Sequence, residues 1–193
     1  MSILRTLIVT GGLVTTLAAQ SNRTSWPLNQ APAELRPAIS RADLVIVAMH
    51  GAVLRDLHRE LSERSPARAI NFFHLDITAA IQRLERDEGI AAGWTSDRLR
   101  NPANAPKPWV APLVQAHAGQ PARSVEGFAV DLGDKVGVLR PIVERPICAS
   151  CHGPQLAPGV QAAMPLRYRL DRAVGFANGE IRGWYWVEMP KSR

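Results

Sequence analysis

The spacing of apolar residues predicts two helices in the first half of the chain. Apolar side chains recur every three or four positions over residues 40–66, with Ser40 as the expected N-cap and Pro66 at the end. The same period continues over residues 67–89, where glycine ends the run. The short turn around Pro66 predicts that the two helices are antiparallel neighbours.

The second half of the chain has patterns typical of strands. Residues 124–133 and 135–145 predict a hairpin that turns near Gly133. Residues 173–190 predict another hairpin, with its turn near Gly179 and an aromatic second strand. Two helices, an irregular proline-containing loop and two hairpins, in this order, predict an α+β fold with an antiparallel sheet.

The N-terminal residues have the layout of a secretory signal. Arg5 precedes an apolar run from Leu7 to Ala19 that ends in small residues, with cleavage expected near Ala18 or Ala19. The run is shorter than the ~20 apolar residues that a membrane-spanning helix needs. We expect residues 20–193 to form one periplasmic domain without stable membrane insertion after signal cleavage. The alternative is an uncleaved anchor.

The charge pattern excludes one class of partner. The formal net charge is +6, and the basic residues are scattered among acidic ones. Nucleic-acid binding requires a clustered basic patch with interleaved aromatic residues, which the sequence lacks. We therefore expect no nucleic-acid partner.

Cys148 and Cys151 are the only cysteines of the chain, and His152 follows them directly. A disulfide across this spacing closes a very small loop and adds little stability. Redox dithiols of the thioredoxin type lie early in their fold, at a helix N-terminus. A zinc site needs three or four ligands, and no further cysteine is present to supply them.

Covalent haem accounts for every feature of this motif. The two thiols of C-x-x-C-H each bind one vinyl group of haem c, and the histidine becomes the proximal iron ligand. An exported compartment without a spare thiol fits this chemistry. We therefore predict one haem, attached through Cys148 and Cys151, with His152 as its proximal ligand.

Several residues could occupy the second axial position. His74 lies on an apolar helix face with isoleucines at positions 70, 77 and 81, and is the preferred candidate. A core histidine satisfied by a hydrogen bond is the alternative interpretation. His50 is the main competitor, while His58 and His117 have more polar surroundings. Three methionines, Met49, Met164 and Met189, are further possible ligands.

The loop over residues 93–114 supplies candidate contacts to the haem propionates. Its four prolines exclude a continuous helix, and its asparagines can close turns onto their own backbone. Arg98, Arg100 and Asn101 are the cofactor-binding candidates in this loop. An ordinary surface connection is the alternative.

Three stretches together resemble the PAS-like c-type haem family: TSDRLRNPANAPKPW, CASCHGP and DRAVGFANGEIRGWYWVEMP. This family is found free in the periplasm and as the sensory domain of histidine kinases and chemotaxis-type receptors. The resemblance runs from about Ala67 to Pro190. It implies a PAS-like antiparallel sheet, two N-terminal helices packed over the haem, and a proximal ligand at His152.

The chain departs from the family at one position that matters. Members commonly have a cysteine in the helix reading A-I-x-x-C, and it serves as the distal ligand in at least one of them. Phe73 occupies the matching position here, so this ligation is impossible. His74 is adjacent, but one residue step rotates a side chain by ~100° around a helix.

The sequence leaves two functions open. A six-coordinate haem held by His152 and His74 would act as an electron carrier or redox sensor, with a redox or signalling partner in the periplasm. A gas sensor for NO or CO, with Phe73 beside an open distal pocket, is the alternative. We expect no enzyme activity, because the sequence places no acid or base beside the iron.

Overall fold

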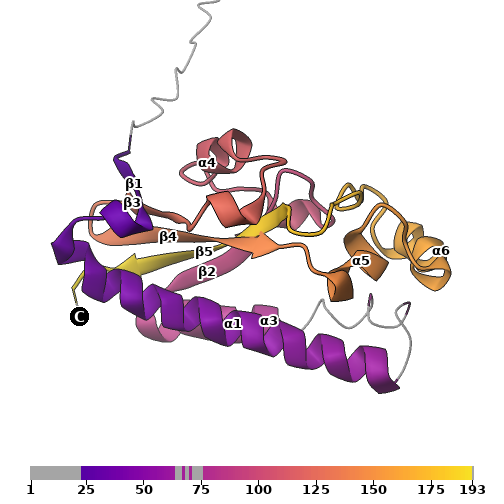
Figure 1. Ribbon diagram of the computed structural model, residues 1–193. Coiled ribbons are helices and arrows are strands. Elements are labelled where there is room, and N and C mark those ends of the chain that lie inside the picture. Colours follow the sequence, from indigo (N-terminus) through magenta and orange to yellow (C-terminus); the bar gives the residue numbers. More distant parts are fainter. Residues whose placement is uncertain (1–22, 64–66, 68–69, 71–75, 193) are drawn as a thin grey trace, which may run out of the picture.

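The structure, a computed structural model, describes residues 23–63, 67, 70 and 76–192. The predicted signal segment, Phe73 and His74 lie outside the described residues. The elements are connected in the order that Figure 1 shows.

Five strands form one antiparallel sheet in the order β1-β3-β4-β5-β2. Their bounds are Ser25–Pro27 (β1), Ala91–Thr95 (β2), Phe128–Asp131 (β3), Lys135–Val143 (β4) and Ile181–Pro190 (β5). The first predicted hairpin is confirmed, because β3 and β4 pair on either side of a turn in which Gly133 has a φ of 92°. The predicted α+β class with an antiparallel sheet is therefore confirmed.

Two helices cover one face of this sheet: α1 (Arg36–Glu63) and α3 (Asp76–Glu88). Both predicted helices are present in the described residues, and α3 ends just before Gly89, whose φ is 66°. Ser40 is not the N-cap, since α1 begins at Arg36. Pro37 explains the earlier start, because its fixed φ suits the first turn of a helix.

The apolar side of α1 packs against the middle of the sheet. Ile46 and Met49 are each 6% exposed and belong to one core cluster with Val138 and Val187 of the central strands. By length and composition alone, residues 33–62 would also qualify as a membrane-spanning helix. One stripe of this helix is buried against the sheet, while Leu44 and Val47 are 70% and 67% exposed.

The opposite face of the sheet carries α4 (Ala111–Ala116), which buries Val110 and Val114 against Leu139 and Trp184. Two further helices, α5 (Pro146–His152) and α6 (Pro158–Arg167), lie together at one end of the sheet (Figure 1). Short 3-10 turns complete the described part: Leu28–Gln30, Ala33–Leu35, Pro102–Asn104 and Ala122–Ser124.

The second predicted hairpin is confirmed in its turn and second strand but wrong in its first strand. The turn at Gly179 is present, with a φ of 84°, and the aromatic strand is β5. However, β5 pairs with β4 and β2, and residues 173–178 form no strand. The backbone of this stretch bonds to the cysteine motif instead: Gly175 N–H donates to Gly153 O at 3.0 Å and Phe176 N–H to His152 O at 3.1 Å.

The predicted irregular loop over residues 93–114 is also shorter in the structure. Strand β2 takes its first residues, and α4 takes its last ones. The sequence showed no alternation across β2 because this strand is buried at nearly every position. Prolines did not prevent α4, since Pro112 lies in its first turn, where a missing N–H costs nothing.

Candidate functional site

The cysteine motif forms a short helix directly after strand β4. Pro146 begins α5, and both cysteines lie on it three positions apart, so they share one helix face. Both thiols are free. Burial raises the pKa of the Cys151 thiol, which keeps it protonated near neutral pH.

His152, the last residue of α5, is held in one tautomer. Its Nδ1 lies 2.9 Å from the carbonyl oxygen of Ala173. Because a carbonyl can only accept, Nδ1 carries the proton and Nε2 keeps its lone pair. Burial, and then the charges of Arg182 and Arg100, lower the pKa of His152 well below its ordinary value. The ring is therefore neutral. The Ala173 carbonyl holds the ring through Nδ1, and Nε2 keeps the lone pair that could bind a metal, as in most metal-ligating histidines.

A cavity of about 390 Å³ joins the predicted site residues. Its wall includes both cysteines, His152 and the three polar candidates of the loop, which are Arg98, Arg100 and Asn101. Much of the remaining wall is apolar or aromatic: Leu57, Ile70, Ile81, Trp94, Tyr168, Tyr185 and Trp186. The structure thus places six of the seven predicted site residues on one wall. The seventh, His74, lies outside the described residues.

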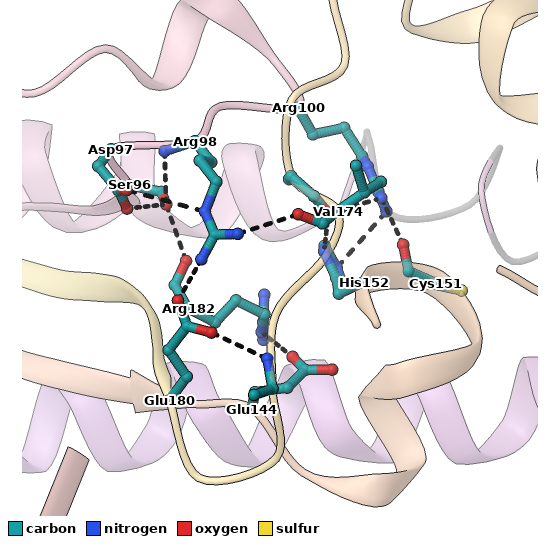
Figure 2. Close-up of polar contacts among 12 residues, drawn as sticks. Ser96, Asp97, Arg98, Arg100, Glu144, Cys151, His152, Val174, Glu180 and Arg182 are labelled. Carbon is teal, nitrogen blue, oxygen red and sulfur yellow. Dashed lines mark hydrogen bonds and ion pairs between the residues drawn. The ribbon is translucent and has the colours of Figure 1, made fainter. Parts of the chain in front are cut away.

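Arg98 is held against the segment that follows the motif (Figure 2). Its guanidinium donates to Val174 O at 3.1 Å, forms an ion pair with Glu180, and lies 3.5 Å from the centroid of the Phe176 ring. Through Arg98, these contacts hold the loop against residues 174–180.

Arg100 reaches further into the motif. It donates to Cys151 O at 2.5 Å and to Ala173 O at 3.2 Å, and its Nε lies 3.2 Å from Asp171 Oδ1. Its Nη1 lies 3.5 Å from His152 Nε2. Arg100 thereby ties the loop, α5 and the segment around Ala173 together. A propionate contact of either arginine stays a prediction.

Asn101 closes the turn that its sequence position predicted. Its side-chain oxygen accepts from the Ala103 N–H at 3.1 Å and caps the 3-10 turn Pro102–Asn104. This confirms the turn, and a contact of Asn101 with a cofactor stays a prediction.

Sequence reasoning missed a buried ion pair behind the motif. Arg182 of β5 lines the cavity, and its Nε lies 3.3 Å from Glu144 Oε2. Glu144 is 1% exposed, and neither of its carboxylate oxygens accepts a hydrogen bond within the described residues. Burial raises the pKa of Glu144, and Arg182 opposes that shift. The one signal in the sequence was the position of the two charged residues: Glu144 directly follows the apolar strand β4, and Arg182 lies near the start of the apolar strand β5.

The competing axial ligands lie off the cavity wall. His50 Nδ1 lies 3.2 Å from the Tyr185 hydroxyl oxygen, and the two rings meet edge to face. Burial, helped by Arg145 and Arg182, lowers the pKa of His50. Neither His50 nor Met49, Met164 or Met189 lines the cavity, and all three methionines are buried in the core. His117 ends α4, where its Nδ1 lies 2.9 Å from Leu113 O.

Zinc finds no support in the described part of the chain, where no group of three or more His, Cys, Asp or Glu side chains could hold a metal ion. The motif therefore offers one nitrogen ligand and two thiols rather than a tetrahedral ligand set.

Comparison with known proteins agrees with the family resemblance seen in the sequence. A family model described as Tll0287-like matches residues 15–190. Among solved structures, the cyanobacterial haem protein Tll0287 is 26% identical, with a TM-score of 0.46, and the match covers 59% of this chain and 69% of that one. No curated protein matches the chain. Because the family model spans most of its length, the chain belongs to the Tll0287-like family.

Proposed function

We propose that this chain is a periplasmic monohaem c-type cytochrome that exchanges single electrons, as a carrier or a redox sensor. The observation that carries the proposal is the placement of Cys148, Cys151 and His152 on one cavity wall, with His152 neutral and its Nε2 unprotonated. The family adds support, because the protein from which it takes its name is described as a haem protein.

The residues present fit a covalent haem. The two free thiols would hold the vinyl groups, and His152 would be the proximal ligand, with its Nδ1–H bonded to Ala173 O. The cavity volume lies in the usual range for cofactor sites, and aromatic side chains line it as an apolar macrocycle requires. Bound haem supplies one-electron iron chemistry, which this chain lacks by itself.

Three arginines on the cavity wall favour redox chemistry as the function. Arg98, Arg100 and Arg182 line the cavity, and each is paired with a carboxylate, of Glu180, Asp171 and Glu144 respectively. Charge and burial near an iron centre set its reduction potential. In a haem-loaded site these arginines could bind the propionates, and their positive charge would favour the ferrous over the ferric state. An electron carrier or redox sensor depends on this adjustment.

The first experiment tests haem attachment. Protein produced in a host with cytochrome c maturation should retain its colour after acid–acetone extraction and give the pyridine haemochrome spectrum of c-type haem. The Cys148→Ala, Cys151→Ala double variant should be colourless, while Ser150→Ala, between the two cysteines, should be loaded like the wild type. Colourless wild-type protein, or haem that extracts freely, would refute the proposal.

The second experiment tests the distal ligand, which stays a prediction. Ile70, which precedes His74 by four positions in the sequence, is 6% exposed and lines the cavity. If His74 binds iron, both oxidation states should be low-spin, and His74→Ala should become high-spin and bind CO.

His50→Ala is the matched control for this experiment, and its spectrum should be nearly unchanged, because His50 does not line the cavity and contacts it only through its partner Tyr185. The opposite pattern would identify His50 as the ligand and keep the redox function. A wild-type ferrous form that is high-spin and binds CO readily would contradict the electron-transfer proposal and favour a gas sensor.

A further inference from the structure

An exposed basic and apolar patch spans the last turn of helix α6 and the residues that follow it. Leu166 is 87% exposed and Leu170 is 71% exposed, although large apolar side chains are normally covered. Three arginines at positions 167, 169 and 172 alternate with them, and all three are exposed. We call these five residues the α6 patch: Leu166, Arg167, Arg169, Leu170 and Arg172.

The charge of this patch is not neutralised by its own segment. Asp171 is the one acidic residue within it, and its side chain is 8% exposed because it turns inward to Arg100. Within the described part of the chain, none of the patch arginines has an ion pair, whereas Arg98, Arg140 and Arg182 each have one. Three positive charges around two leucines therefore face solvent.

The α6 patch adjoins two residues of the cavity wall along the chain. Tyr168, inside the patch sequence, lines the cavity, and so does Ala173, directly after it. Ala173 is also the residue whose carbonyl orients His152. Helix α6 packs through Val160 and Met164 in a cluster that includes Cys151, and it lies beside α5 in Figure 1.

We propose that the α6 patch is the docking surface for an acidic redox protein. This inference rests on the proposed electron-transfer function, and it names the kind of partner. Complementary charge speeds and orients encounter, while an exposed apolar centre gives short-range contact without a permanent interface. The patch residues adjoin Tyr168 and Ala173 of the cavity wall along the chain, so a partner seated here would lie near the cavity, and electron tunnelling falls steeply with distance.

Two other occupants fit less well. A second copy would bring the same positive patch to a chain whose net charge is +6, and like charges repel. An anionic membrane would attract arginines and leucines too, but it offers no redox centre to a surface that adjoins the cavity. Vesicle binding is therefore an outcome of the test.

The experiment compares two triple variants of the haem-loaded protein. The first reverses the patch: Arg167→Glu, Arg169→Glu and Arg172→Glu. The control makes the same change in net charge at exposed arginines in other elements: Arg36→Glu, Arg86→Glu and Arg123→Glu. Stopped-flow absorbance then follows oxidation of the ferrous protein by hexacyanoferrate(III). Each event moves one electron and no proton, giving ferric protein and hexacyanoferrate(II).

A binding measurement accompanies these rates. Titration calorimetry at low salt measures the affinity of each variant for an acidic plastocyanin-type copper protein. Pelleting with vesicles of anionic phospholipid measures membrane binding. The patch variant should react with hexacyanoferrate ~10-fold more slowly than the control variant and bind the acidic protein ~10-fold more weakly. Both differences should shrink as added salt screens the charges.

Equal losses in the two triple variants would overturn the proposal, since net charge alone would then explain them. Loss of vesicle binding in the patch variant, with unchanged affinity for the acidic protein, would overturn it in favour of a membrane. Failure of the proposed function looks different: wild-type protein would carry no haem or show no absorbance change with hexacyanoferrate.

Discussion

Two regions of the molecule are stabilised in different ways: the apolar end, where α1 packs on the sheet, and the charged end, where β4 leads into α5. Where α1 crosses the sheet, Ile46 and Met49 meet Val138 and Val187 in an apolar core. At the other end, where β4 leads into α5, the structure buries charges: Glu144, Arg182 and Asp171 are all mostly covered. In Figure 2, Glu144 and Arg182 lie on one side of His152 and Arg100 lies on the other.

The apolar end mainly provides stability, and the charged end mainly positions side chains. Apolar burial stabilises by about 25 cal/mol per Å². A buried ion pair gains little net stability, because desolvating both charges offsets their attraction. The charged end therefore contributes less to the free energy of unfolding. The charged end instead holds the cysteine motif in place, because Arg98 and Arg100 connect the loop to the 171–176 segment and to the motif.

The largest expected effect is at the apolar end. Ile46→Ala should lower the free energy of unfolding by about 3 kcal/mol, through lost burial and the cavity left behind. The haem spectrum should not change, since Ile46 does not line the cavity. Urea unfolding followed by circular dichroism measures the first effect, and absorbance the second.

Leu44→Ala on the same helix is the matched control. Leu44 is 70% exposed, so its removal should change stability by less than about 0.5 kcal/mol. If both variants lost the same stability, α1 would not be packed on the sheet as the structure has it. An altered haem spectrum in Ile46→Ala would show that the two ends are coupled.

A smaller effect is expected at the charged end. Arg182→Gln leaves the Glu144 carboxylate buried without its partner, which should cost about 2 kcal/mol of unfolding free energy at pH 7. Unlike Ile46→Ala, this variant should also shift the reduction potential downward, because a cation on the cavity wall is lost. Potentiometric titration measures the shift.

The double variant Glu144→Leu, Arg182→Leu sharpens this comparison. It removes both charges, so it should recover most of the stability that Arg182→Gln loses. Arg145→Gln, at an exposed arginine next to Glu144, is the control and should leave stability nearly unchanged. A double variant that is less stable than Arg182→Gln would mean that the pair is a net source of stability.

The apolar end was largely predictable from the sequence. Periodicity located both helices, and the turn at Gly133 located the β3–β4 hairpin, because both signals are local. The spacing of C-x-x-C-H singled out the motif residues, and the structure brings them to one cavity, while their attachment to a haem stays a prediction. Arg98 and Arg100 were found in the loop, although their contacts with the 171–176 segment were not.

The rest could not be predicted because it depends on contacts between distant segments. Strand β5 was expected to pair with residues 173–177, its nearest neighbours along the chain, but it pairs with β4 and β2. The residues before it bond to the motif instead, through Gly175 and Phe176. Likewise, nothing local indicates that Glu144 and Arg182 meet, since each one ends or begins a different strand.

The smallest expected effect is a pH dependence at the charged end. Burial raises the pKa of Glu144 above its ordinary value, so the folded protein keeps this proton to a higher pH than the unfolded chain does. Between the two pKa values the folded state binds more protons. The free energy of unfolding must therefore fall as pH rises through that window, which begins near pH 4.5.

Glu144→Gln removes this titration while keeping the size of the side chain. The attraction to Arg182 exists only when Glu144 is ionised, so its loss is part of the same pH dependence, and the slope rather than the absolute stability is the informative quantity. Relative to wild type, the variant should gain stability as pH rises above about 4.5 and then level off. Glu34→Gln, at an exposed carboxylate, should follow the wild-type curve. Urea unfolding measured from pH 4 to 8 gives all three curves, and parallel curves for Glu144→Gln and wild type would mean that Arg182 fully offsets the burial of Glu144.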